Sequence, residues 1–574
     1  MVQQLQQLSN KFGVKVDGAP LEAEVDDLLV AAVVDDSLHL PDLFTLTFRD
    51  PLRAVLTSAK IKVGSVLEVS VFSEAAPGGE PLITGEVTAL EAEFGGEGTF
   101  TIVRGFDHSH RLFRGRITET YTDATYADVV RKVAKRAGLE TGKIDSTTTV
   151  HKHVCQANEC DWHFLQRLAR EIGYEVAVVE SKLEFRIPTG SAGAPGKASL
   201  DAENPLQLVY GSNLLRFHTI VTAAEQVKEV QVRGWDVTQK RAVIGTAPAK
   251  TTSAELSIAP ADLAAKFGGA TYVGVDVPYG TQAEVDAAAK AMAEQVAGAF
   301  AELEGVARGN PKLRAGAAVS LSLVGPPFDG KYRLTSTRHA YDPHAGYTTA
   351  LVASGRQERS LLSLASGGTT NGRPIAGVVN ATVTDVNDPD QLGRVKLMFP
   401  WLSDTYVSDW TRVTQPGAGP DRGAMVLPEV NDEVLVSFEQ GDIRRPYVVG
   451  GLHNGIDKPK LGDGLVDSST GAVRRRGFVS KKGGMLIFLD DDSDEGVALL
   501  TGDKGYRIAL NKTKTTIHIA SNGKVEIEGA QDVTIKAGGN LKVEATGSLE
   551  LKGAKVSVNA NGPVEVKGNP IELN

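Results

Sequence analysis

The residues with the clearest potential for chemistry lie in the first third of the chain. His151, His153, Cys155, Cys160 and His163 fall within one short segment, and imidazole and thiolate groups are the usual ligands of zinc. Their spacing does not reproduce the paired Cys-x2–4-Cys and His-x3–5-His pattern of zinc sites. His151 and His153 alternate along a strand-like stretch, whereas Cys160 and His163 stand at the start of a predicted helix. Ordinary packing therefore explains these residues better than a metal site, and no cofactor is expected.

Two other segments resemble ligand-binding loops without completing the pattern. In the acidic run Asp490–Gly496, a calcium loop counted from Asp491 has Gly502 at its twelfth position, where the bidentate glutamate belongs. Residues 190–198 come close to a phosphate-binding loop, but Ala198 replaces the required Ser or Thr. We expect a solvated hairpin turn at the first segment and a flexible surface loop at the second.

Signals for catalysis or nucleic-acid binding are missing. The chain has no G-x-S-x-G or H-E-x-x-H motif. Its net charge is -10, and its longest basic block is Arg474 to Arg476, whereas phosphate binding needs clustered Lys and Arg. We therefore expect a protein that is not an enzyme, with these arginines in a solvated neck and no nucleic acid as partner.

The absence of these motifs still leaves two functions open, glycan degradation and sugar binding. A tail spike that degrades cell-wall or capsule glycan would need two carboxylates in one cleft, which a sequence cannot establish. A sugar-binding adhesin would need exposed aromatics, for which Trp401, Tyr406, Trp410 and Tyr447 are candidates. Core packing explains these four residues equally well.

Length and composition limit the elements that carry these residues. A chain of 574 residues exceeds one hydrophobic core, so we expect about three to five domains. Sixty-one glycines against 6% aromatics favour β-structure with many tight turns. Two cysteines fit a reducing cytoplasm. The N-terminus has no signal-peptide core, and the apolar run Leu28–Val34 is far shorter than a membrane span. We expect cytoplasmic assembly, then incorporation into a larger particle.

The C-terminal segment has a short apolar repeat. Apolar pairs recur every seven or eight residues, at Val525/Ile527, Val533/Ile535, Leu541/Val543, Leu549/Leu551, Val556/Val558, Val564/Val566 and Ile571/Leu573. Within each pair, the residue between the two apolar members is polar. This alternation with a period of two is typical of a β-strand. Gly, Ala and Asn between the pairs supply the bends. A repeat this short cannot enclose a core alone, since common single-chain solenoids need about 20 residues per unit.

Three chains around one axis would solve this problem. Seven pairs give 14 inward residues per chain, or 42 in a trimer. At ~1.5–3 kcal/mol each, their gross burial is on the order of 60–130 kcal/mol, before the entropy of ordering is subtracted. Alternating Lys and Glu on the outer face resist edge pairing with other sheets. The pattern thus predicts an intertwined triple-stranded β-helix in a homotrimer.

The rest of the chain reads as a mixed hub followed by a small barrel. Residues 372–455 contain five or six short strands, which suits a closed barrel of the OB-fold type. In the hub, helices are expected over Thr125–Ala137 and Asp161–Ile172, closed by glycines. Thr281 and Glu284 form a capping box before an amphipathic helix with the apolar face Val285, Ala289, Met292, Val296, Phe300 and Leu303. The fold class is mainly β with an α+β hub that contains barrel-like sheets.

Several motifs resemble one known family. The segments QANECDWHFLQRLAREIGYEV and LEGVARGNPKLRAGAAVSL are similar to phage late-control hub proteins, and DPDQLGRVKLMFPW and PEVNDEVLVSFEQGDIRRPYVVGGLHNG are similar to the barrel of spike proteins. Nearly the whole chain resembles the VgrG spikes of type VI secretion systems and their relatives in extracellular contractile injection systems. The domains implied are a phage tail hub (1–365), a linker (366–371), an OB-fold-like barrel (372–455), a neck (456–480) and a trimeric needle (481–574).

The resemblance also implies partners. A trimeric hub would contact the inner tube and baseplate proteins, and the needle would carry a small tip protein of the PAAR type toward a target membrane. We expect Asn569, Pro570, Ile571, Leu573 and Asn574 to contact that tip protein, because they expose apolar side chains and strand ends. Some relatives carry a hydrolase or effector domain, for which we expect no room here, so any effector cargo would be separate.

Overall fold

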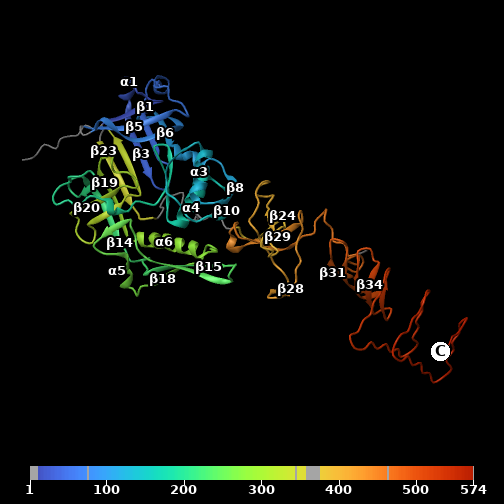
Figure 1. Cartoon of the computed structure of the whole chain (residues 1–574). Coiled ribbons are helices and arrows are strands. Elements are labelled where there is room, and N and C mark those ends of the chain that lie inside the picture. The colour runs from blue at the N-terminus through green and yellow to red at the C-terminus, as the bar shows by residue number, and fades with distance from the viewer. Residues whose placement is uncertain (1–10, 74–75, 343–345, 357–374, 462–463, 573–574) are drawn as a thin grey trace, which may run out of the picture. The chain divides into compact units, whose positions relative to one another are not determined.

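The structure, a computed structural model, describes residues 11–73, 76–342, 346–356, 375–461 and 464–572. The predicted linker 366–371 lies outside these residues. The chain divides into two compact units, residues 1–454 and 455–574, each of which is described by itself (Figure 1). Strands dominate both units, as the composition predicts.

The largest sheet of the first unit has eleven antiparallel strands. In spatial order they are β14 (Leu214–Val221), β19 (Ala301–Arg308), β23 (Gly346–Ala353), β22 (Ser336–Asp342), β3 (Leu29–Ser37), β4 (Leu43–Arg49), β7 (Gly98–Asp107), β6 (Ala76–Gly95), β5 (Val66–Ser73), β1 (Lys11–Val16) and β2 (Ala19–Pro20). Alternate residues such as Phe44, Leu46 and Val103 are buried in one core, so the period-two pattern places one face of these strands inward.

Smaller elements complete the hub. They are α1 (Ala23–Asp26), α2 (Val55–Ser58), η1 (His108–Phe113), β8 (Ile117–Ala124), β9 (Glu140–Ile144), β10 (His151–Glu159), β11 (Glu175–Val179), β12 (Lys182–Arg186), η2 (Ser191–Gly193), β13 (Gln207–Val209), β17 (Ala254–Leu256), α5 (Pro260–Ala265), β20 (Ala318–Ser322) and β21 (Gly330–Arg333).

Two hub helices form where the sequence predicts them. Helix α3 (Tyr126–Ala137) follows a capping box between Thr125 and Asp128 and ends at Gly138, whose φ of 67° is left-handed. Helix α4 (Asp161–Ile172) ends at Gly173, with a φ of 74°. Glycine adopts this conformation without the penalty of a Cβ atom. Both helices pack into one core, together with strands β8 and β10 to β12.

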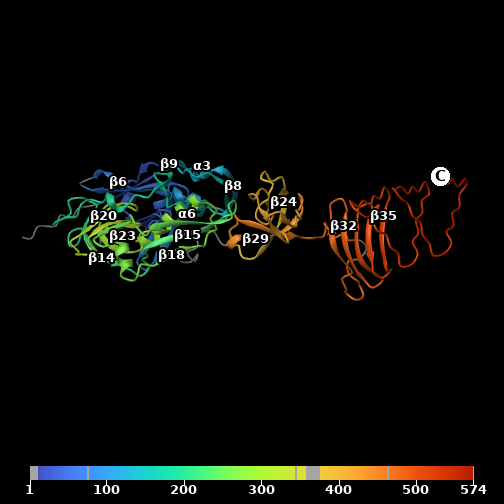
Figure 2. The ribbon, with the colours of Figure 1, turned by 60° about the horizontal axis from the view of Figure 1, so that its bottom comes forward.

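The prediction of the third helix is correct at its start and wrong at its end. Helix α6 (Gln282–Gly298) begins at the Thr281–Glu284 capping box and covers the sheet of β15 (Glu229–Asp236), β16 (Arg241–Pro248) and β18 (Thr271–Gly274) (Figure 2). Phe300 and Leu303 lie beyond the helix, in another core, and Leu303 belongs to β19. Their spacing continues the helical period, but the chain turns into a strand after Gly298.

The barrel closes with five strands. In order they are β25 (Lys396–Met398), β24 (Val378–Asp385), β29 (Glu433–Phe438), β30 (Pro446–Gly451) and β26 (Arg412–Val413). Val395 and Thr411 exchange two backbone hydrogen bonds of 2.9 and 2.7 Å and join the first strand to the last. A hairpin of β27 (Ala418–Gly419) and β28 (Arg422–Gly423), with the 3-10 turn η3 (Glu439–Gly441), completes this OB-like domain. The predicted barrel is confirmed.

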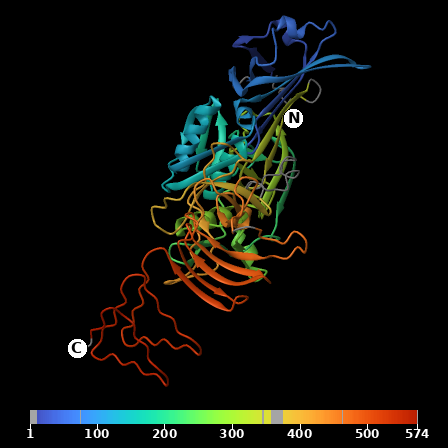
Figure 3. The same cartoon turned by 90° about the vertical axis from the view of Figure 1, so that its right-hand side faces the viewer.

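The second unit begins with an antiparallel meander. Its strands are β31 (Arg475–Val479), β32 (Met485–Asp491), β33 (Asp494–Leu500), β34 (Tyr506–Asn511) and β35 (Thr516–Ser521). Figure 3 shows these strands side by side, followed by the winding chain of the repeat. No strand is assigned within 522–572, so the single chain does not contain the β-strands predicted for the repeat.

Candidate functional site

The meander presents one apolar face. Cross-strand partners place Leu486 beside Leu499, Leu499 beside Ile508, and Ile508 beside Ile519. A second row contains Phe488, Val497, Leu510 and Ile517. These side chains share a face because successive residues of a strand alternate sides. Most of them are exposed, from 36% for Leu486 to 73% for Ile517. We call these two rows, with Phe478 and Tyr506, the apolar face of the meander.

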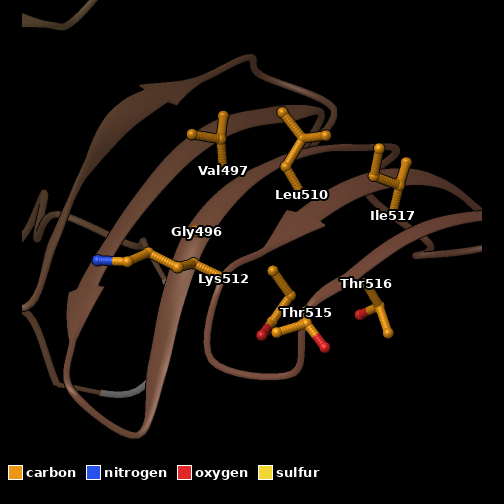
Figure 4. A pocket seen from close by; sticks show the side chains of 8 residues that line it. Gly496, Val497, Leu510, Lys512, Thr515, Thr516 and Ile517 are labelled. Carbon is orange, nitrogen blue, oxygen red and sulfur yellow. The ribbon is translucent and has the colours of Figure 1, made fainter.

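A shallow groove of about 310 Å³ lies on this face. Val497, Leu510 and Ile517 project from the same side of the sheet, and Lys512, Thr515 and Thr516 lie at one end (Figure 4). Aliphatic side chains dominate it, and it contains no carboxylate, imidazole or thiol among its lining residues. This groove suits the burial of apolar side chains.

The sequence interpretation underrated this surface. The pairs Leu486/Phe488, Val497/Leu499, Ile508/Leu510 and Ile517/Ile519 have the same two-residue alternation as the repeat. Successive pairs are far enough apart in sequence for a complete strand and a turn, so neighbouring strands pair within one chain. This alternation was the sequence signal from which the apolar face of the meander could have been predicted.

The repeat continues the exposure of apolar side chains. Thirteen of its fourteen apolar residues are described, and their exposed fractions run from 49% for Ile571 to 72% for Ile527. On the residues of opposite parity, Lys542 forms an ion pair with Glu544, and Lys567 forms one with Glu565. The chain therefore separates an apolar from a charged side, and its own residues do not cover the apolar side.

The expected tip contact is only partly described. Asn569, Pro570 and Ile571 are exposed, whereas Leu573 and Asn574 lie outside the described residues. The contact with a tip protein remains a prediction.

The potential metal ligands point to separate neighbours. The ring of His151 stacks on Tyr126 at 4.2 Å, and His163 meets the ring of Phe113 edge-on at 5.8 Å. Cys160 precedes α4 in the hub core. In the part of the chain that the structure describes, no three His, Cys, Asp or Glu residues are grouped to hold a metal ion.

The other two ligands face the barrel. His153 Nε2 lies 3.1 Å from the carbonyl oxygen of Val407, and Cys155 is buried among the barrel's core residues. Burial raises the pKa of the Cys155 thiol to about 12, so it stays protonated at neutral pH. A thiol in that state is a poor ligand and a poor nucleophile.

The acidic run forms the predicted hairpin turn. Asp491 pairs with Asp494 across β32 and β33, and the Ser493 backbone N–H donates to Asp491 at 2.9 Å. Arg474 pairs with Asp467 and Asp491, and Arg476 pairs with Asp490. Two of the three arginines of the basic block are therefore paired with carboxylates of their own unit.

The near-miss phosphate loop lies at the surface, as predicted, apart from Ser191. Ser191 is buried, and its N–H donates to Thr252 at 2.7 Å. Gln207 donates to the Gly196 carbonyl at 2.8 Å, and the Ala198 N–H donates to Ser322 at 3.0 Å. These bonds hold the segment at three points, and its flexibility stays a prediction.

The barrel aromatics divide between core and surface. Tyr406 is 2% exposed and packs in the barrel core, and Trp410 carries the Lys396 ammonium over its ring at 4.9 Å. Trp401 is half-exposed. The four residues therefore do not form one exposed aromatic platform of the kind that sugar binding uses.

Comparison with known structures shows a similar fold. A chain of the Francisella PdpA–VgrG complex in its half-lidded state has a TM-score of 0.54 with 8% identity, covering 90% of this chain and 89% of that one. A chain of the lidless complex has a TM-score of 0.50 with 8% identity, covering 89% and 98%. At this identity the likeness concerns the fold alone.

Sequence comparison adds the family. The model of the type VI secretion system/phage-baseplate injector OB domain matches residues 379–453, and the model of the Alg8 N-terminal domain matches residues 80–342. The Pseudomonas aeruginosa spike protein VgrG2a is 30% identical over 165 residues, 28% of this chain and 19% of that protein. VgrG1a of the same organism is 44% identical over 69 residues, 11% of each chain. The chain is similar to VgrG-type spikes of type VI secretion systems, and its residues 379–453 match the OB domain shared with phage baseplates.

The "Actin cross-linking toxin VgrG1" of Vibrio cholerae is 30% identical over 177 residues, 30% of this chain and 15% of that protein. The matched stretch thus spans less than a fifth of the length of the curated relatives named here. Among the described residues, no helix is long and apolar enough to cross a membrane.

Proposed function

We propose that the protein is the non-enzymatic spike of a contractile injection machine and works as a homotrimer. The observation that carries this proposal is the uncovered apolar surface of the second unit, which includes the apolar face of the meander and the repeat from Val525 to Ile571. Monomeric proteins rarely expose contiguous apolar patches larger than a few hundred Å². Two further copies of the same chain would cover this surface.

The geometry of the repeat favours three copies. Each unit of the repeat contributes only two apolar side chains to one side of the chain, and three such sides enclose a prism with a dry interior. The Lys and Glu residues of opposite parity then face water. The resulting rod has no open sheet edge along its length, which suits a part that must not bend or unfold when it is driven through an envelope.

The proposed partners follow from the similarity to VgrG-type spikes. We infer that the hub seats on the inner tube within a baseplate and that the repeat ends against a small PAAR-type tip protein. Any effector cargo is a separate protein, and the target membrane is contacted mechanically. Assembly takes place in the cytoplasm, before or within an injection particle.

Mass in solution tests the proposal. Sedimentation equilibrium of the purified full-length chain at micromolar concentration should give three times the mass of 60.8 kDa. A stable, folded monomer would contradict the proposal. A zymogram on peptidoglycan tests the absence of catalysis separately, since turnover there would favour the glycan-degrading alternative.

A further inference from the structure

The hub and the barrel meet through a chain of alternating buried charges. Arg444 of the barrel donates from Nη1 to Glu171 Oε1 of helix α4 at 3.0 Å. The same guanidinium donates from Nη2 to Asp442 Oδ2 at 2.8 Å. On the hub side, Arg167 donates to Glu159 at 2.5 Å and lies 3.9 Å from Glu171. The sequence Glu159–Arg167–Glu171–Arg444–Asp442 therefore alternates in sign and crosses from hub to barrel.

The charges in this chain are largely removed from water. The side chains of Arg167, Glu171, Glu159 and Asp442 are exposed by 8, 12, 15 and 17%. Burial opposes ionisation of Glu171, but Arg444 and Arg167 outweigh it and lower the pKa of this carboxyl. Arg444 likewise outweighs burial at Asp442 and lowers its pKa. Both carboxylates are thus ionised at neutral pH, and loss of one partner would leave an uncompensated buried charge.

Apolar contacts surround the charges. Cys155 of β10 is fully buried within the barrel's core cluster, beside Tyr406. The Arg167 guanidinium also donates to the Cys155 carbonyl at 2.8 Å, so the same strand is held from both sides. Tyr126 donates its hydroxyl to Glu171. Strand β10 and helix α4 therefore form a socket whose polar and apolar contacts both continue into the barrel.

We propose that this chain of charges, from Glu159 to Asp442, fixes the OB barrel on the β10–α4 socket, and we call it the docking key. As a result, the hub and the barrel unfold and resist mechanical load as one body. The key is a property of one chain and does not depend on the proposed trimer. Removal of a charge on either side should loosen the backbone on the other side, because coupling between two sites is reciprocal.

Hydrogen–deuterium exchange on the full-length protein tests the key in both directions. Arg444→Met should speed exchange of hub residues 151–172 at least tenfold, and Glu171→Gln should do the same for barrel residues 439–451. The matched controls are Arg394→Met, which breaks an ion pair with Asp388 inside the barrel, and Glu184→Gln, which breaks one with Arg186 inside the hub. Each control should leave the opposite segment within twofold of the wild type.

The proposal is overturned if either key variant affects only its own domain, or if the controls loosen the opposite segment equally. Should Arg444→Met fail to fold, Arg444→Lys provides the same readout. Lysine keeps the charge but lacks the planar fork that contacts two carboxylates at once, so a loosened hub segment still supports the key and an unchanged one contradicts it.

Discussion

The replacement Val533→Asp tests the proposed three-chain core at one level of the repeat. Val533 is 55% exposed in the single chain, so in the trimer about half of its side chain remains to be buried. Its neighbour Thr534 points the opposite way in an extended strand. Thr534→Asp therefore adds the same charge one residue away, on the outer face, and is the matched control.

The expected loss can be worked from three contributions. The loss of the burial that the Val533 side chain would gain in the trimer amounts to about 1 kcal/mol per chain. Three carboxylates about 6 Å apart around an axis repel by roughly 3 kcal/mol per pair at an effective dielectric constant of 20, and each also loses hydration. The electrostatic penalty has an upper limit, because a buried carboxylate can instead take up a proton. At pH 7.5 this protonation costs about 5 kcal/mol per carboxyl. We expect Val533→Asp to destabilise the trimer by ~3–5 kcal/mol per chain and Thr534→Asp by less than ~1 kcal/mol.

Sedimentation velocity across a guanidinium series measures this difference. The trimer of Val533→Asp should dissociate at a clearly lower denaturant concentration than the wild type, and Thr534→Asp should match the wild type. A carboxyl buried at the axis has a raised pKa, so its penalty is present above that pKa and is relieved as the pH falls toward about 4. Recovery of ~1–3 kcal/mol per chain between pH 7.5 and 4.5 is expected, because the lost burial is not restored. Equal effects of the two variants, or no recovery in acid, would refute the reasoning.

Three further outcomes are expected. Burial raises the pKa of Asp107 to about 7, so the wild type loses stability as the pH rises from about 4 to 7. Asp107→Asn should thus increase the free energy of unfolding by ~2–4 kcal/mol at pH 8 and by little at pH 4, as measured by denaturation at both values. Thr125→Ala removes the cap of α3 and should reduce the free energy of unfolding by about 1 kcal/mol in the same assay. Cys155 should resist iodoacetamide at pH 8 until the protein unfolds, because its thiol is buried and protonated; mass spectrometry detects the adduct.

Local signals in the sequence predicted local structure well. The capping residues Thr125 and Thr281 and the closing Gly138 and Gly173 mark helix ends that the structure reproduces. The failure at Phe300 has a physical reason, since the spacing of apolar residues stays the same when a helix passes into a buried strand. Pattern alone does not locate such a junction.

Contacts distant in sequence could not be predicted. Glu171 and Arg444 are 273 residues apart, and each lies in a segment that is polar for its own local reasons. The motifs around them were recognisable as those of hub and barrel, but nothing in either motif indicates that the two charges meet. For the same reason, Cys155 was grouped with nearby histidines, whereas its real neighbours belong to the barrel core.

The repeat shows how the strand prediction and the unpaired single chain are compatible. In the meander, short turns bring consecutive strands side by side, so every inner strand finds both hydrogen-bond partners in its own chain. In the repeat, each extended segment spans only about three residues around an apolar pair, and a bend then redirects the chain. Its own next segment therefore does not pair with it, and its exposed backbone donors and acceptors would need partners from other chains once the proposed trimer excludes water. The apolar side chains and the backbone groups of the repeat thus both lack partners within the single chain, and the proposed intertwined trimer would supply partners to both.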